Sequence, residues 1–185
     1  KRGCAFAMLA GFLLAALTVG YMFVEPHWLR VTRLEIADRD IPPAFDGKRI
    51  VLLSDIHHGP YFSIARVKRL VELVNGLQPD IVLLGGDFVH RDAKYIAPVF
   101  AELTRLRAPL GVFAVAGYHD HWEGIEETRR EMAKAGIANL DNRAEWIAVG
   151  GARIKVGGVG DVYEDSQDIG QTIADTLAAN GARVV

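Results

Sequence analysis

The chain of 185 residues is long enough for one domain with a hydrophobic core. Half of its residues are apolar and its formal charge is −2, so nucleic acid is not expected as a partner, because domains that bind it usually carry a basic excess. The single cysteine, Cys4, excludes an intramolecular disulfide and a cysteine-based zinc site.

An uncharged stretch of the right length for a membrane span opens the chain. Residues 4–24 carry no charge, and as a helix they would rise about 31 Å, which matches a bilayer core. Tyr21 and Trp28 would fall near one interface, where amphipathic aromatic residues are common. A membrane anchor is therefore predicted. The alternatives are a cleaved signal peptide, which usually has a shorter apolar region, and a buried core helix.

Basic residues on both sides of this stretch give opposing indications of its orientation. Lys1 and Arg2 favour a cytoplasmic N-terminus, which would put the following domain outside the cytoplasm. Arg30, Arg33 and Arg39 favour the opposite orientation. We expect a single-pass protein of the cell membrane with an extracytoplasmic domain.

Strand and helix patterns alternate through the rest of the chain. Expected strands cover residues 31–36, 50–53, 81–87, 110–117, 145–149 and 152–159, and expected helices begin at Ser63 and cover 94–107, 125–135 and 168–179. The three fully apolar strands, 50–53, 81–87 and 110–117, have crossover helices between them. This arrangement predicts an α/β domain with a buried sheet over residues 31–185, after an anchor and linker at 1–30.

Acidic residues and histidines follow each of these three strands, in the sequences LLSDIHHG, LLGGDFVH and AVAGYHDH. In open α/β sheets, ligands bind at the carboxyl ends of the strands. Asp55 and His57 could hold a divalent metal ion together, and Asp87 could bridge two ions. Taken singly, an aspartate after a strand is usually a cap and a lone histidine is usually a surface residue. The repeated pattern favours one shared site.

DIHHG, GGDF and GYHD, within residues 51–122, resemble the first three sequence blocks of the calcineurin-like metallophosphoesterase superfamily. The chain is most similar to its branch of membrane-anchored bacterial phosphohydrolases. The resemblance implies a sandwich of two sheets flanked by helices, incomplete here. It also implies two divalent metal ions, for which oxygen and imidazole ligands suit Mn, Fe, Zn or Ni.

The resemblance implies a role for each matching residue. Asp55 and His57 would bind the first metal ion, and Asp87 would bridge both ions. His119 would face the phosphoryl group, stabilise its charge and protonate the leaving oxygen. Asp120 would orient or tune that histidine.

Four further residues lie at variable positions of the pattern. Arg91 could reach a phosphate oxygen, or it could be an ordinary surface arginine. His58, His90 and His121 are expected to be exposed to solvent or to lie behind the ligands.

The chain departs from the pattern at Tyr118, where the family has an asparagine that binds the second metal ion. A phenol binds metal only as phenolate, and its reference pKa is about 10. The second metal would then be weakened or lost, or the tyrosine would serve a different use; a single base change in the sequence would also produce it.

The family also completes its site with later histidines, whereas this chain has none after His121 and ends at GARVV. We expect a C-terminal truncation, and we expect the chain as given to bind metal poorly and to hydrolyse little.

The expected activity is metal-dependent hydrolysis of a phosphomonoester, a phosphodiester or a pyrophosphate. A phosphorylated small molecule or a lipid would be the substrate, and the anchor favours a phospholipid or a lipid similar to UDP-diacylglucosamine. One rival is a catalytically impaired pseudoenzyme or binding protein that keeps the fold, for which Tyr118 is the reason. Another is a nuclease of the same superfamily, which the near-neutral charge disfavours.

Overall fold

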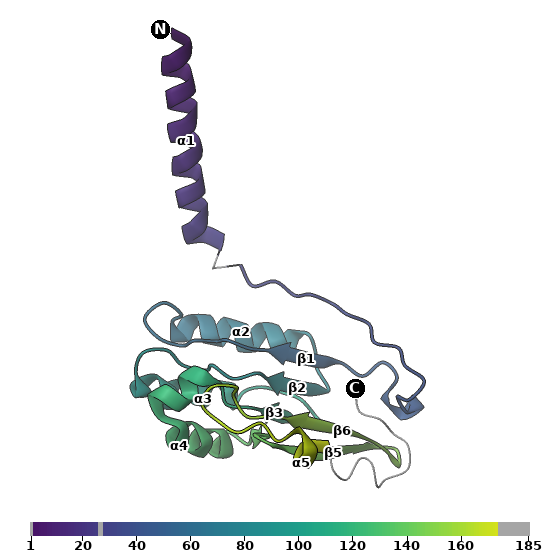
Figure 1. Cartoon of the computed structure of the whole chain (residues 1–185). Coiled ribbons are helices and arrows are strands. Elements are labelled where there is room, and N and C mark those ends of the chain that lie inside the picture. The colour runs from purple at the N-terminus through teal and green to yellow at the C-terminus, as the bar shows by residue number, and fades with distance from the viewer. Residues whose placement is uncertain (1, 26–27, 174–185) are drawn as a thin grey trace. The chain divides into compact units, whose positions relative to one another are not determined.

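The computed structural model of the chain describes residues 2–25 and 28–173 (Figure 1). The chain divides into two compact units, residues 1–36 and residues 37–185.

The first unit contains one long apolar helix, α1 (Arg2–Val24). Its segment Phe6–Val24 has a mean hydropathy of 2.1, and none of this segment is buried. At 1.5 Å per residue a helix of this length reaches across a bilayer core. Length and composition therefore make α1 a candidate membrane span.

The strand expected at residues 31–36 is absent, so that prediction was wrong. Leu34 is 83% exposed and Ile36 is 63% exposed, so the apolar side of the alternating pattern has no core to cover it. An alternating sequence forms a strand only where a neighbouring strand and a buried face are both available.

The second unit is built on a parallel sheet of four strands in the order β1-β2-β3-β4. The strands are β1 (Ile50–Leu53), β2 (Ile81–Leu84), β3 (Val112–Ala114) and β4 (Ala138–Asn139), and the helices between them are α2 (Ile64–Gly76), α3 (Ile96–Leu103) and α4 (Tyr118–Lys134). Short 3₁₀ helices lie at η2 (Pro43–Phe45) and η3 (Ala93–Tyr95). An antiparallel hairpin, β5 (Arg143–Val149) with β6 (Ala152–Gly158), and the short α5 (Ile169–Ile173) follow.

Two separate groups of buried side chains pack on the parallel sheet. Val67, Val71 and Phe100, from α2 and α3, belong to the group that contains Val82 of β2. Ile81 and its neighbours belong to a second group, which the hairpin completes. Apolar side chains are needed on both faces, which explains the continuous apolar runs in the sequence. The α/β prediction is confirmed.

Two helices begin at other residues than expected. The helix expected at 94–107 is divided into η3 and α3, and Pro98 near the junction has no N–H with which to continue the hydrogen bonds from the preceding turn. The helix expected at 125–135 begins earlier, at Tyr118, and bends at Gly124, where φ is 149°. The helix expected at 168–179 is present as α5, and its last six residues lie outside the described residues.

Removing a core ring should destabilise the second unit strongly. Phe100 is 1% exposed, and its ring centroid lies 4.9 Å from that of Phe88. Phe100→Ala should lower the free energy of unfolding by about 3–5 kcal/mol, because the cavity cannot be refilled. Leu52→Ala, at a side chain that is 70% exposed, should change it by less than about 0.5 kcal/mol. Urea unfolding in detergent, followed by tryptophan fluorescence, measures both; equal losses would contradict this account of the core.

Candidate metal centre

The loops that follow β1 and β2 stay paired beyond the ends of the strands. The amide of His57 donates to the carbonyl of Asp87 at 2.9 Å, and the amide of His58 donates to the carbonyl of Phe88 at 2.8 Å. An isolated parallel bridge joins His58 to Val89. The two loops therefore run side by side, which brings the residues just past β1 next to those just past β2.

Asp55, His57 and Asp87 form one cluster at this edge of the sheet. One ligand atom from each lies within 4.8 Å of those of the other two. His57 Nε2 is 3.5 Å from Asp55 Oδ1 and 3.6 Å from Asp87 Oδ2. The other ring nitrogen, His57 Nδ1, is buried and has no hydrogen-bond partner among the described residues. Two carboxylates around one imidazole fit a divalent ion of the hard or borderline class.

All three residues have a left-handed backbone, which the sequence analysis did not predict. Their φ angles are 57° at Asp55, 47° at His57 and 54° at Asp87. Residues with side chains adopt this region rarely, and each instance costs on the order of 1 kcal/mol. Because such conformations gather at functional sites, their coincidence here favours a built site over three ordinary strand-end caps.

The tip of β3 reaches the same place through a close backbone approach. A Cβ atom on Gly117 would lie 2.6 Å from the backbone nitrogen of Asp87, so only glycine fits there. The amide of His119 donates to Asp87 Oδ1 at 2.9 Å. The structure therefore brings His119 to the cluster, in agreement with the expected meeting of the three strand ends.

Asp120 is buried and binds backbone rather than an imidazole. Its carboxylate accepts hydrogen bonds from the amides of Asp87 at 2.8 Å, Phe88 at 3.0 Å and Gly117 at 2.9 Å. Desolvation raises the pKa of this carboxyl to about 7, while these amides act to lower it. Among the described residues, no hydrogen bond joins this carboxylate to the ring of His119. Asp120 instead fixes the loop that carries His119.

Tyr118, at the position of the family asparagine, begins α4 and packs among aromatic rings. Its ring centroid is 4.3 Å from that of Trp122 and 5.2 Å from that of His119. Desolvation, followed by the charges of Glu164 and Asp161, raises the pKa of the phenol. Tyr118 is therefore neutral at pH 7. With Asp161 and Tyr163 it lines an open depression of about 320 Å³.

The histidines at variable positions are placed differently from one another. His58 is buried, and its Nδ1 lies 2.8 Å from the carbonyl oxygen of Phe62, so it lies behind the cluster. His121 is half-buried, and its Nε2 has no partner among the described residues. The half-buried His90 faces the cluster instead.

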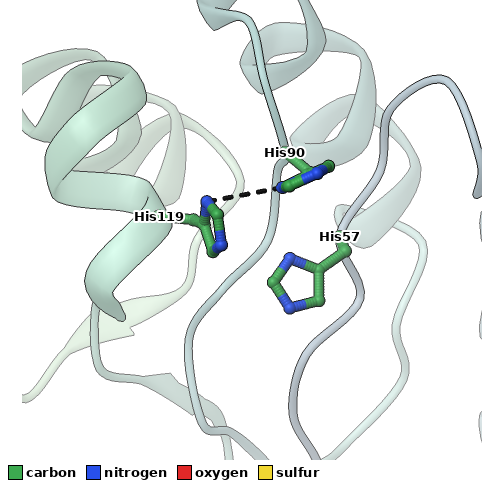
Figure 2. A group of neighbouring side chains, drawn as sticks. All are labelled: His57, His90 and His119. Atoms are coloured by element: carbon green, nitrogen blue, oxygen red, sulfur yellow. Dashed lines mark hydrogen bonds between the residues drawn. The ribbon is translucent and has the colours of Figure 1, made fainter.

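His90, expected at a variable position behind the ligands or in solvent, has its ring beside those of His57 and His119. Its ring centroid is 5.6 Å from that of His57 and 4.7 Å from that of His119 (Figure 2). Desolvation, followed by the charges of His119, His57 and Arg91, lowers the pKa of His90. His90 is therefore neutral at pH 7, since its pKa is lowered from an ordinary value that is already below 7. The sequence signal that could have identified His90 is its position in GGDFVH, three residues after Asp87. The loop that carries it runs beside the loop that carries His57.

Arg91, expected either at a phosphate or free on the surface, makes two defined contacts. Its amide donates to Glu123 Oε1 at 2.7 Å, and its guanidinium Nε donates to His90 Nε2 at 3.2 Å. The guanidinium carbon lies 5.3 Å from the centre of the Tyr61 ring. These contacts put Arg91 beside the cluster.

Comparison with known proteins identifies the family. A model of the calcineurin-like phosphoesterase family matches residues 48–177, which include every residue of the cluster. The chain belongs to this family. The resemblance drawn from three short sequence blocks is thereby confirmed.

Several curated metallophosphoesterases are similar to this chain. An uncharacterized metallophosphoesterase, YkuE, of Bacillus subtilis (strain 168) is 29% identical over 94% of this chain and 62% of its own length. A transmembrane protein with metallophosphoesterase domain of Bos taurus is 36% identical over 50% of this chain and 21% of its own. The UDP-2,3-diacylglucosamine pyrophosphatase LpxG of Chlamydia trachomatis is 41% identical over 53% of this chain and 30% of its own. The chain thus spans less than two thirds of the length of each.

Replacing Asp120 by its amide should loosen the site. In Asp120→Asn one carboxylate oxygen becomes an NH₂ group that faces backbone N–H donors, so at least one buried amide loses its acceptor. The free energy of unfolding should fall by about 1–3 kcal/mol. Asp92→Asn is the matched control, since Asp92, whose side chain is 44% exposed, also accepts from a backbone amide, that of Lys94 at 2.9 Å. Urea unfolding compares them, and a loss no larger than that of the control would contradict the assigned role.

Proposed function

We propose that this protein is a metal-dependent phosphohydrolase whose metal ions bind at Asp55, His57 and Asp87. The observation that carries the proposal is the cluster itself: two carboxylates and an imidazole within 4.8 Å, on left-handed backbone, at adjoining strand ends. Membership of the calcineurin-like phosphoesterase family supports the reaction class.

The donor set defines what the protein would supply to bound metal. Asp55 and His57 would hold a first ion, and Asp87, with two oxygens and a side chain that is 18% exposed, would hold it together with a second. Mn, Fe, Zn and Ni all suit these donors. When bound, such ions supply a Lewis acid for a phosphoryl oxygen and activate water as the nucleophile.

His119 is the group proposed to handle the proton. Its amide is fixed by Asp87 Oδ1, and its ring lies 4.9 Å, centroid to centroid, from that of His57. An imidazole beside the proposed metal ligands could donate a hydrogen to the leaving oxygen. Asp120 supports it through the loop, and Arg91 contributes positive charge at the edge, where an anionic substrate would enter.

A lipid-linked substrate is the proposed specificity. Candidate span α1 would hold the site near a bilayer, and the Bos taurus relative is a transmembrane protein by name. The Chlamydia relative is by name a pyrophosphatase of UDP-2,3-diacylglucosamine. Trp122, 61% exposed, and Tyr163, 81% exposed, offer apolar surface beside Tyr118.

We propose a single-pass cell-membrane protein with its domain outside the cytoplasm.

Tyr118 supports a second candidate, a pseudoenzyme that binds substrate without hydrolysing it. A neutral phenol in an aromatic group with Trp122 and His119 is a poor substitute for a carboxamide ligand. Loss of this ligand would weaken the second metal ion and with it the reaction.

Hydrolysis of bis-p-nitrophenyl phosphate with Mn²⁺ tests the activity. The protein should release p-nitrophenol, and Asp87→Asn should reduce the rate about 100-fold or more, because Asp87 joins both metals. Asp92→Asn is the control and should leave the rate unchanged. An inactive protein that Tyr118→Asn activates would favour the pseudoenzyme. Inactivity of both, with metal bound, would overturn the proposed reaction on this substrate class.

Membrane insertion is tested by changing the middle of α1. The protein should remain in the membrane fraction after a carbonate wash. The double variant Leu13→Arg, Leu14→Arg should be released, because each charge at the bilayer centre costs about 2.5–3.5 kcal/mol. Leu34→Arg, at a side chain that is 83% exposed beyond the helix, is the control and should stay bound. Release of the unaltered protein would contradict the anchor.

A further inference from the structure

Three side chains next to the metal ligands form a chain of contacts: Arg91 to His90, and His90 to His119. We propose that Arg91 and His90 act as positioning residues that fix the tautomer of His119, with its proton on Nε2. The proposal rests on the proposed function in one respect: it specifies how His119 would present a proton in that reaction.

The contact with Arg91 determines which ring nitrogen of His90 carries the hydrogen. The Arg91 guanidinium has only N–H donors, and its Nε lies 3.2 Å from His90 Nε2. His90 Nε2 must therefore accept, so it carries no hydrogen. A neutral imidazole has one N–H group, and that group is then on Nδ1.

The contact with His90 determines, in turn, which ring nitrogen of His119 carries the hydrogen. His90 Nδ1 lies 3.4 Å from His119 Nδ1, the interaction drawn in Figure 2. Because His90 Nδ1 carries the hydrogen, His119 Nδ1 must accept it and cannot carry its own. The hydrogen of His119 is then on Nε2. A doubly protonated His119 would need His90 to accept at both nitrogens, which a neutral imidazole does not do.

The same contact also decides against a three-histidine metal site. His57, His90 and His119 have ligand atoms within 4.8 Å of one another, and tetrahedral Zn–N bonds of about 2.0–2.1 Å would separate two nitrogens by about 3.4 Å. His90, however, has one lone pair, which accepts from Arg91. Its Nδ1 carries a hydrogen and cannot bind metal. The 3.4 Å separation between His90 Nδ1 and His119 Nδ1 therefore belongs to a hydrogen bond and not to two ligands of one metal ion.

Arg91 is itself held at both ends, so the chain of contacts starts from a fixed point. Its amide donates to Glu123 Oε1 at 2.7 Å, and its guanidinium lies over the Tyr61 ring. Its backbone φ of 77° is left-handed, which directs the side chain along a path that ordinary strand or helix geometry does not give. This role uses only the Nε hydrogen of the guanidinium, so it differs from phosphate binding, which would use the terminal N–H groups.

Nitrogen-15 NMR of the histidine rings tests the tautomer without any need for activity. The full chain, labelled at histidine and held in detergent without metal at pH 8, gives separate ring signals. His119→Gln and His90→Gln identify those of the two residues. In the unaltered protein His119 should carry its proton on Nε2 and His90 on Nδ1. Arg91→Met removes the donor, so both rings should become tautomer mixtures. Arg69→Met, at an exposed arginine of α2, is the matched control and should change neither.

A His119 proton on Nδ1 in the unaltered protein, or no change in Arg91→Met, would overturn the proposal. A Zn²⁺ titration that shifts the ring nitrogens of His57, His90 and His119 together would also overturn it in favour of a metal site.

Hydrolysis supplies a second readout where activity is present. His90→Phe should reduce the rate with diphenyl phosphate about tenfold more than the rate with bis-p-nitrophenyl phosphate, because a poorer leaving group depends more on the acid. Equal losses would contradict a role in presenting the proton. Failure of the proposed function would appear separately, as no hydrolysis by the unaltered protein, while the NMR result would still decide the tautomer.

Discussion

The candidate site depends on one buried carboxylate. Asp120 stands in the first turn of α4 and accepts backbone hydrogen bonds from both the β2 loop and the β3 loop. A carboxylate with two oxygens is the smallest side chain that can satisfy three converging amides, and burial leaves no water to replace it. Asp87, the proposed metal ligand, and His119, the proposed proton donor, therefore have their relative positions set by a residue whose hydrogen bonds go to the backbone.

Backbone strain is the second constraint, and it is concentrated at the three residues of the proposed metal site. Asp55, His57 and Asp87 are held in left-handed conformations by hydrogen bonds that continue the β1–β2 pairing into the loops. Such conformations persist only where the surroundings determine them fully. Strand pairing thus fixes the backbone of these three residues, which would reduce the reorganisation that metal binding at the proposed site requires.

The sequence predicted the meeting of Asp55, Asp87 and His119, because parallel strands present their carboxyl ends at one edge and each strand was recognisable as an apolar run. It did not predict the contacts within the edge. The early start of α4 depends on Asp120 capping its own helix, a tertiary choice that hydrophobic periodicity does not record. His90 looked like a variable loop residue because its partners come from two other strands. The strand expected at residues 31–36 failed for the opposite reason: its local pattern alternates, but its apolar residues Leu34 and Ile36 are exposed.

The bend at Gly124 divides α4 into one part that lies at the candidate site and one part that packs in the core. Its φ of 149° breaks the helical period, and a side chain there would meet Ile96 at 3.3 Å. The turn before the bend holds Tyr118 and Asp120, while Met132 beyond it packs in the core. Because the two parts do not share one helical register, a substitution in the first need not rotate the second. The bend therefore separates the part of α4 that shapes the site from the part that packs in the core, so Tyr118 can be replaced without moving Met132.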